Sequence, residues 1–298
     1  KTLIDICKIN SSPSIYHLGY LLGPRINAGG RVGKCSHGAN LLLNKDPKFS
    51  FKLASELDQY NKERQMLEKD LLQKILNQTK DYSKDPVLIL SGNNWHEGVI
   101  GIVASRLKDK FNKPVIVISL EGDIGKASAR SIVGFDIGSI IISATQQNIL
   151  LKGGGHKMAG GFSIKMENIE KFKDYVFRKF SKINENLKID RPLLFDSIIA
   201  PSAVNLEFYY KVELLSPFGS GNPEPKFIIE DLKTVNGKIV GEKHIKSVLI
   251  GKDGSSIKSI AFNALDNDIS SYLLKNNNKS FNIAGKLSLN EWRGQSNV

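Results

Sequence analysis

The order of hydrophobic and polar residues predicts a long helix near the start of the chain. Between Phe49 and Lys80, apolar side chains recur at three- and four-residue steps with charged residues between them. This is the period of an amphipathic helix. We therefore expect a connecting helix over residues 49–82, following a mixed segment at residues 1–48.

Residues 83–188 have the pattern of an α/β domain. Short apolar runs typical of buried strands alternate with longer amphipathic stretches typical of helices. Strands are expected at residues 86–92, 113–120, 124–132 and 160–165, and helices at 95–111, 136–147 and 167–187. Asp136 is placed to cap the second of these helices. Strands that alternate with helices form βαβ units, so we expect a parallel or mixed sheet.

Residues 189–298 predict a small all-β domain. Gly and Asp turns separate short strand-like segments, which lie at residues 225–235, 241–251, 255–265 and 280–292. Short strands at close intervals are typical of a small barrel or sandwich.

The charge of the chain points to polyanionic partners. Lys and Arg number 42 against 30 acidic residues, for a net charge of +12. Such an excess attracts nucleic acid, although a composition rich in Lys and Asn would also produce it. No apolar run is long enough to span a membrane, no signal-peptide layout is present, and two cysteines make no disulfide framework. We expect a cytoplasmic protein.

The segment GGGHKMAGG, residues 153–161, is the most unusual in the chain. Glycine is costly to order, so such a run inside a domain indicates backbone that approaches something closely. One interpretation is a tight loop whose backbone N–H groups bind a phosphate, with His156 donating a hydrogen bond to a phosphate oxygen or stacking on a base. The other is a tight turn between strands with an incidental histidine.

Two further segments carry groups suited to phosphates. In GKASARSI, the side chains of Lys126, Ser128 and Arg130 alternate onto one face of the expected strand, where a hydroxyl and a guanidinium can hold a phosphate together. An exposed polar strand face is the simpler interpretation. In GPRINAGGRVG, Arg25 and Arg31 bracket Asn27 on what we expect to be a rigid loop, suited either to nucleic-acid contacts or to an inter-domain salt-bridged corner.

The segment LLSPFGSGNPEPKF contains a rigid turn with two nearby aromatic residues. Phe227 is expected in the core, whereas Phe218 could stack on a nucleic-acid base or pack in the core. The chain lacks an Asp-x-Asp with a neighbouring His pair, and it lacks P-loop, GxSxG and GxGxxG motifs. We therefore expect a phosphate-binding protein with no catalytic residue and no metal ligand in this chain.

Taken together, these segments resemble the DHH/DHHA1 phosphoesterase superfamily, and within it the RecJ-type single-stranded-DNA exonucleases. The segment at residues 153–161 looks like the DHHA1 motif, and WHEGVIGIVASRL and KASARSI match other segments of that domain. GPRINAGGRVG resembles the end of the DHH domain, and LLSPFGSGNPEPKF with GEKHIK resembles the appended oligonucleotide-binding (OB) domain. Smaller departures from the family pattern are Gly30, Ala129 and Gly161.

The resemblance implies an architecture. Residues 1–48 would be the end of a DHH domain, residues 49–82 a connecting helix, residues 83–188 a DHHA1 domain with a mixed sheet, and residues 189–298 an OB-fold β-barrel. The Mn²⁺ or Mg²⁺ of the family would be bound by DHH motifs that lie before Lys1, in the same polypeptide or in a separate DHH-domain chain. This chain is expected to be a monomer.

The resemblance also implies roles for residues in a 5′→3′ exonuclease of DNA repair and recombination. Ser128 and Arg130 would bind the 5′-phosphate, and Arg25, Asn27, Arg31, Lys126 and Phe218 would contact the strand. The loop of Gly153, Gly154, Gly155 and His156 would close on the terminal nucleotide. Two alternatives remain open: a DHH-family phosphodiesterase acting on short oligonucleotides or cyclic dinucleotides, and a non-catalytic nucleic-acid-binding module resembling the RNA-binding domain of alanyl-tRNA synthetases.

Overall fold

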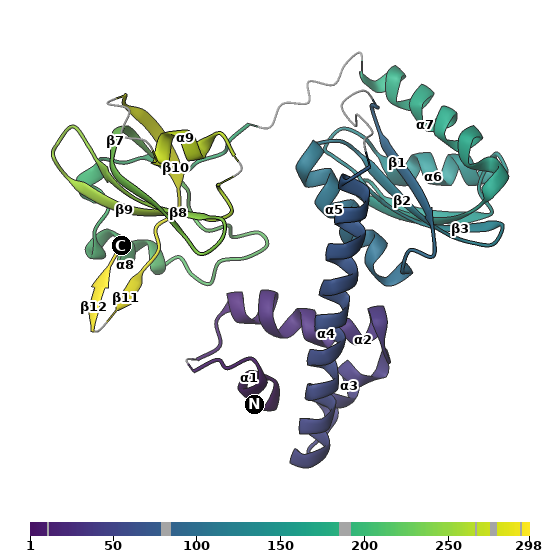
Figure 1. Ribbon diagram of the computed structural model, residues 1–298, viewed down its shortest axis with the longest axis horizontal. Helices are drawn as coiled ribbons and strands as arrows, with labels where there is room; N and C mark the ends of the chain where they lie inside the picture. The colour runs from purple at the N-terminus through teal and green to yellow at the C-terminus, as the bar shows by residue number, and fades with distance from the viewer. Residues whose placement is uncertain (11, 79–84, 185–191, 266, 275–278, 293) are drawn as a thin grey trace. The chain divides into compact units, whose positions relative to one another are not determined.

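The computed structural model describes residues 1–10, 12–78, 85–184, 192–265, 267–274, 279–292 and 294–298 (Figure 1). The chain divides into two compact units, Lys1–Asp190 and Arg191–Val298. No helix among the described residues combines the length and apolar character needed to cross a bilayer.

The first unit begins with short helices packed on one long helix. They are α1 (Thr2–Ile6), a π-helical turn (His17–Leu22), α2 (Gly23–Val32), α3 (Ser36–Leu43) and the long α4 (Pro47–Leu76). Asp46 caps α4 by accepting a hydrogen bond from the Lys48 backbone N–H. The expected connecting helix is confirmed within the described residues, and its predicted end at 82 lies outside them.

A mixed five-stranded sheet forms the centre of the α/β region. Its strands, in the spatial order β1-β2-β3-β5-β4, are β1 (Leu88–Asn93), β2 (Val115–Glu121), β3 (Ile124–Arg130), β5 (Ala159–Lys165) and β4 (Lys152–His156). The β1–β2 pair is parallel and the others are antiparallel. The mixed sheet expected from the sequence is confirmed.

Helices cover both faces of this sheet. They are α5 (Glu97–Phe111), α6 (Ile137–Gln146) and α7 (Ile169–Asn184). Because side chains alternate along a strand, Ile116 and Ile118 of β2 pack with α6 and α7, whereas Val115 and Val117 pack with α5 and the end of α4. The near-continuous apolar sequence of β2 follows from burial on both faces. The expected cap of α6 is also confirmed, since Asp136 accepts from the Ser139 N–H at 3.0 Å.

The second unit is built around a curved sheet in the order β10-β7-β8-β9, as Figure 1 shows. The strands of this sheet are β7 (Phe227–Val240), β8 (His244–Ile250), β9 (Ser256–Ala261) and β10 (Phe281–Gly285), and β6 (Ser197–Ile198) pairs with β7. A separate pair is formed by β11 (Asn290–Trp292) and β12 (Gln295–Asn297). Strand β7 pairs with β10 through its first half and with β8 through its second, and a register shift lies between Thr234 and Asn236. Such irregularities bend a strand and curl the sheet.

The sequence pattern missed two helices of this unit, α8 (Leu206–Glu213) and α9 (Ile269–Leu274). Both are short, so they give few periods to detect. Helix α9 is held by the sheet, where Thr234 Oγ1 donates to the Tyr272 carbonyl at 2.7 Å and Ser247 Oγ to the Leu273 carbonyl at 3.0 Å. The proposed domain boundary at 188–189 lies outside the described residues.

Candidate nucleic-acid interface

Three elements of the first unit converge on one cleft of about 280 Å³. They are the end of α2, the start of α5 and the face of β3 that carries Lys126, Ser128 and Arg130. The lining residues are Gly30, Arg31, Glu97, Gly98, Ile100, Gly101, Lys126, Ala127, Ser128 and Arg130. Four of the sequence-predicted residues, Arg31, Lys126, Ser128 and Arg130, are thereby brought together from segments about 100 residues apart.

Strand alternation places the polar side chains of β3 on the cleft side. Gly125, Ala127 and Ala129 are buried, whereas Ser128 and Arg130 are half-buried. Arg130 Nη1 donates to Ser128 Oγ at 3.1 Å and to the Ala129 carbonyl at 2.8 Å. These bonds hold the guanidinium beside the hydroxyl, the arrangement expected from the SAR sequence.

Glycines allow α5 to lie close to both neighbouring elements. A Cβ on Gly101 would lie 2.9 Å from Ser128 Oγ and 3.1 Å from Arg130 Nη2. A Cβ on Gly98 would collide with the carbonyl oxygen of Arg31. The glycines of the EGVIG segment therefore shape the cleft, a role that the sequence alone did not reveal.

Two guanidinium groups give the cleft its charge. Burial, and then the positive charge of Arg31, lower the pKa of Arg130 from its usual value, so Arg130 is partly desolvated and close to a like charge. Arg31 Nη1 donates to the Gly98 carbonyl at 3.1 Å. Among the described residues that line the cleft, the single carboxylate is that of Glu97, and it pairs with Lys126 at 2.6 Å. Among the described residues, no carboxylate is paired with Arg31 or Arg130, so these two guanidinium groups are suited to bind an anion.

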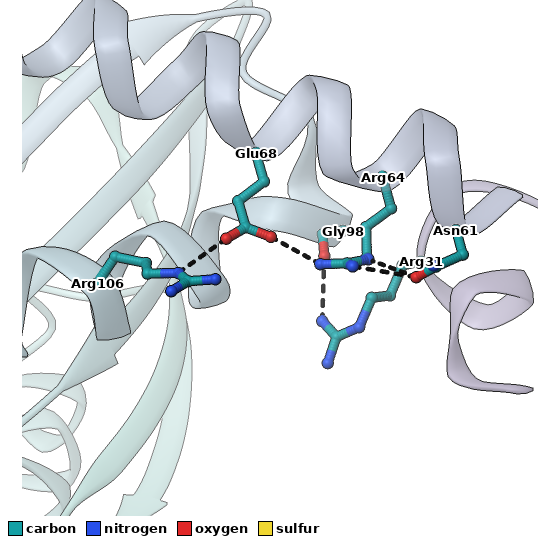
Figure 2. A network of polar contacts seen from close by, with 6 residues as sticks. All are labelled: Arg31, Asn61, Arg64, Glu68, Gly98 and Arg106. Carbon is teal, nitrogen blue, oxygen red and sulfur yellow. Dashed lines mark hydrogen bonds and ion pairs between the residues drawn. The ribbon is translucent and has the colours of Figure 1, made fainter. Parts of the chain in front are cut away.

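An ion network centred on the buried Glu68 carboxylate lies between α4 and α5. Figure 2 shows the Glu68 carboxylate between Arg64 (2.6 Å) and Arg106 (2.9 Å). Arg64 also donates to Asn61 Oδ1 at 3.0 Å. The Glu68–Arg106 pair therefore joins the connecting helix to the α/β region by a charge-assisted hydrogen bond, whereas the bonds of Arg64 lie within α4.

The glycine run occupies a different place from the one expected. Residues 152–156 form the edge strand β4, which pairs with β5, so the prediction of a loop is wrong. A Cβ on Gly153 would lie 2.7 Å from Ile141 of α6 and 2.8 Å from Phe162 of β5. The glycines of β4 and β5 permit α6 to pack closely on these two strands. His156 is exposed, its Nδ1 accepts from the Met158 N–H at 3.3 Å, and β4 does not line the cleft.

The GPRINAGGRVG segment is helical, so the prediction of a rigid loop is also wrong. Pro24 lies in the first turn of α2, where proline is tolerated. Arg25 pairs with Asp58 of α4 at 2.8 Å, a salt bridge within the first unit. Asn27 is exposed, and neither residue lines the cleft.

The outer face of β8 and β9 is basic and partly apolar, which sequence reasoning missed. Lys246 lies between Lys238 of β7 and Ile260 of β9 in the sheet register. Phe262, which is 68% exposed, packs edge-on against His244 at 5.3 Å. Lysines directly opposite each other repel, and exposed aromatic rings beside lysines suit single-stranded nucleic acid.

Phe218, the aromatic residue predicted to contact DNA, lies elsewhere in the same unit. It is half-buried against a small cluster that contains Val212, Phe227 and Leu287. The expected core position of Phe227 is confirmed. The outward face of β8 and β9 could have been found by taking alternate residues of GEKHIKSVLIG and SSIKSIAFNAL.

No site for a metal ion is evident in the part of the chain that the structure describes. No group of three or more His, Cys, Asp or Glu side chains gathers there as metal ligands. The described residues therefore do not fit the divalent ion that the family resemblance implies, and none of them is assigned a catalytic step through such an ion.

Comparison with known protein families identifies both units. The DHHA1 domain model matches residues 84–182, and the RecJ OB domain model matches residues 195–298. The connecting helix and the segment before it lie outside both matches.

Curated relatives match nearly the whole chain. The single-stranded-DNA-specific exonuclease RecJ of Haemophilus influenzae is 32% identical over 94% of this chain and 50% of its own length. RecJ of Bacillus subtilis is 29% identical over 93% of this chain and 35% of its own length. The chain therefore spans half or less of these relatives.

Solved structures agree. The crystal structure of RecJ in complex with Mg²⁺ from Thermus thermophilus matches with a TM-score of 0.81 and 27% identity, over 99% of this chain and 44% of that one. The structure of the same protein with Mn²⁺ gives a TM-score of 0.82. With both domain models in order and both units matched, the chain belongs to the RecJ family of the DHH/DHHA1 superfamily and corresponds to its DHHA1 and OB portion.

Proposed function

We propose that this chain supplies the 5′-phosphate-binding and single-strand-binding part of a 5′→3′ single-stranded-DNA exonuclease acting in DNA repair and recombination. The observation that carries the proposal is the convergence of Arg31, Ser128 and Arg130 in one cleft. The exonuclease assignment follows the relatives, which are single-stranded-DNA-specific enzymes.

The cleft would bind the terminal phosphate by charge and geometry. Arg130 and Arg31 would donate charge-assisted hydrogen bonds to its oxygens, and the Ser128 hydroxyl would donate another. A monoester phosphate carries more negative charge than an internal phosphodiester, so it gains more from two guanidinium groups. The cleft would thereby set the polarity of degradation by holding the 5′ end.

The second unit would bind the strand without reading its sequence. Lys238, Lys246 and Lys258 would neutralise backbone phosphates, and Phe262 would offer a stacking surface for a base. Phe218 and the exposed Asn27 remain proposed strand contacts. The hairpin of Gly153, Gly154, Gly155 and His156 lies outside the cleft, and we retain it as a proposed contact of the terminal nucleotide.

The catalytic metal would be bound elsewhere. We propose that residues 1–48 belong to the end of a DHH domain, and that Mn²⁺ or Mg²⁺ binds to DHH motifs outside these 298 residues, in the same polypeptide or in a separate DHH-domain chain. The relatives' structures contain these two ions. The chain by itself is expected to be monomeric and to bind DNA without cleaving it.

Binding to single-stranded DNA with a 5′-phosphate or a 5′-hydroxyl tests this function. At fixed salt, the chain should prefer the phosphate by about ten-fold, equivalent to about 1.4 kcal/mol. Arg130→Ala should abolish the preference, and Arg130→Lys should keep part of it, because an ammonium retains charge but not the bidentate fork. Arg178, an exposed arginine of α7, provides the matched control as Arg178→Ala.

The same assay separates the alternatives. Equal binding of both ends by the unaltered chain would contradict the end-binding function. Preference for dinucleotides over long strands would favour a phosphodiesterase of short substrates, and RNA binding indifferent to the 5′ end would favour a non-catalytic module. Cleavage by this chain alone with Mn²⁺ would overturn the placement of the metal site.

A further inference from the structure

A carboxylate inside a cleft for anions requires an explanation. Glu97 is the first residue of α5, and among the described residues it alone brings negative charge to the cleft lining. Negative charge is favourable at the start of a helix, but at this position it also repels a bound phosphate.

Glu97 is engaged by Lys126 rather than by either arginine. Lys126 Nζ lies 2.6 Å from Glu97 Oε1, and this hydrogen bond raises the pKa of Lys126. Lys126 precedes Ser128 by two residues on the same strand face, which is about 7 Å along β3. The ion pair therefore lies beside the phosphate-binding groups, one side-chain step farther along the strand.

The pairing sets the charge available to a ligand. With Lys126 neutralised by Glu97, Arg31 and Arg130 leave two positive charges in the cleft. A terminal phosphate carries about −1.5 to −2 at pH 7, whereas an internal phosphodiester carries one negative charge. The cleft is therefore matched to a terminal phosphate.

We propose that the Glu97–Lys126 ion pair is a selectivity element that restricts the cleft to strand ends. A strand that continued past the cleft would bring its next phosphate toward the Glu97 carboxylate, while Lys126, held by Glu97, is not free to bind that phosphate. The inference rests on the proposed end-binding function and adds to it the residues that exclude internal segments of the strand.

Three DNA ligands of equal length test this inference in competition binding at fixed salt. They are linear DNA with a 5′-phosphate, linear DNA with a 5′-hydroxyl, and circular single-stranded DNA, which has no end. In Glu97→Gln, the carboxylate is lost and the Lys126 ammonium is released. The variant should bind circular DNA about two- to five-fold tighter, the range for exposed ion pairs, with a smaller gain for the 5′-phosphate.

Glu121→Gln provides the matched control. Glu121 is exposed, lies outside the cleft lining and acts on Lys126 only through its charge, so the substitution makes the same change in net charge. It should alter the affinities for all three ligands by one common factor. If Glu97→Gln also raises all three equally, or raises circular DNA no more than Glu121→Gln does, the inference is wrong.

Lys126→Met completes a double-mutant cycle. Alone it leaves the Glu97 charge uncompensated and should weaken binding of all three ligands. The loss of affinity that Lys126→Met causes should be much smaller in the Glu97→Gln variant than in the unaltered chain. Additive effects of the two substitutions would contradict the coupling. An unaltered chain without phosphate preference contradicts the proposed function itself, whereas a preference that Glu97→Gln leaves intact contradicts only this inference.

Discussion

At the scale of single residues, the geometry of the phosphate cleft depends on Gly101. The Cβ in Gly101→Ala would press on Ser128 Oγ and Arg130 Nη2, so these side chains would have to shift. Alanine is also a better helix former than glycine by about 0.8–1 kcal/mol. We expect the preference for a 5′-phosphate to fall several-fold while the melting temperature stays level or rises, as measured by DNA binding and thermal denaturation of one preparation.

Gly30→Ala is the matched control for Gly101→Ala. Gly30 is also helical and lines the same cleft, but its added Cβ would meet only the Cβ of Cys35, at 3.9 Å. The phosphate preference should therefore be unchanged. Equal loss in both variants would show that the Gly101 contact with Ser128 and Arg130 is not what shapes the cleft.

A second prediction at this scale concerns Asp58 and pH. Burial raises the pKa of Asp58, but hydrogen bonds and charge from Lys62 and Arg25 outweigh it, and the net pKa is lowered. A lowered carboxyl pKa stabilises the folded chain above the unfolded pKa of about 3.9, and this stabilisation is lost as pH falls through the folded pKa. Asp58→Asn should therefore lower the free energy of unfolding at pH 7, and the difference from the unaltered chain should shrink toward pH 3.

At the scale of elements, the ion network on α4 depends on Glu68. Its side chain is 9% exposed, and that of Arg64 is 12% exposed. Glu68→Gln would leave the Arg64 guanidinium buried without its carboxylate, which should cost about 3 kcal/mol in urea unfolding. Arg106→Ala should cost less than about 1 kcal/mol, because Arg106 is 64% exposed. The opposite ranking would contradict the role given to Glu68 in Figure 2.

The glycine hairpin shows what sequence could and could not predict about elements. Helical periodicity identified α4 and α5, and a continuous apolar run identified β2, which is buried on both faces. The run at residues 153–155 gave no such signal, because glycines have no side chain to alternate. The strand that they form packs closely on α6 at Gly138, where an added Cβ would lie 2.8 Å from the His156 backbone nitrogen and oxygen. That contact joins two elements, α6 and β4, that no local pattern links.

The packing of α6 on β4 gives a further prediction. Gly138→Ala should destabilise the chain by about 1–3 kcal/mol, because its Cβ meets backbone atoms that cannot rotate away. Gly154→Ala should be near neutral, because nothing lies within 4 Å of its added Cβ. Chemical denaturation of the two variants compares them directly, and equal losses would mean that α6 does not require the close approach.

At the scale of the whole molecule, sequence pattern was sufficient for the order of domains but not for the surfaces that they present. The SAR alternation identified half of the cleft, because period two places Ser128 and Arg130 on one face. The position of Arg31 in the cleft could not be predicted from local pattern, because it results from the packing of α2 on α5 at Gly98. The lysines of β8 and β9 were equally hidden, because their exposure depends on which face of the curved sheet covers the core.

The two units should contribute separable properties to DNA binding. For single strands, the logarithm of the binding constant falls with the logarithm of salt by about 0.7 per neutralised phosphate. Replacing Lys246 and Lys258 by alanine should thus reduce that slope by about 1.4 while leaving the ratio between 5′-phosphate and 5′-hydroxyl DNA unchanged. Arg130→Ala should remove the ratio with a smaller change in slope. Lys211→Ala, on α8, controls for the loss of one lysine charge. A Lys246 and Lys258 double variant that also lost end preference would contradict the separation of roles.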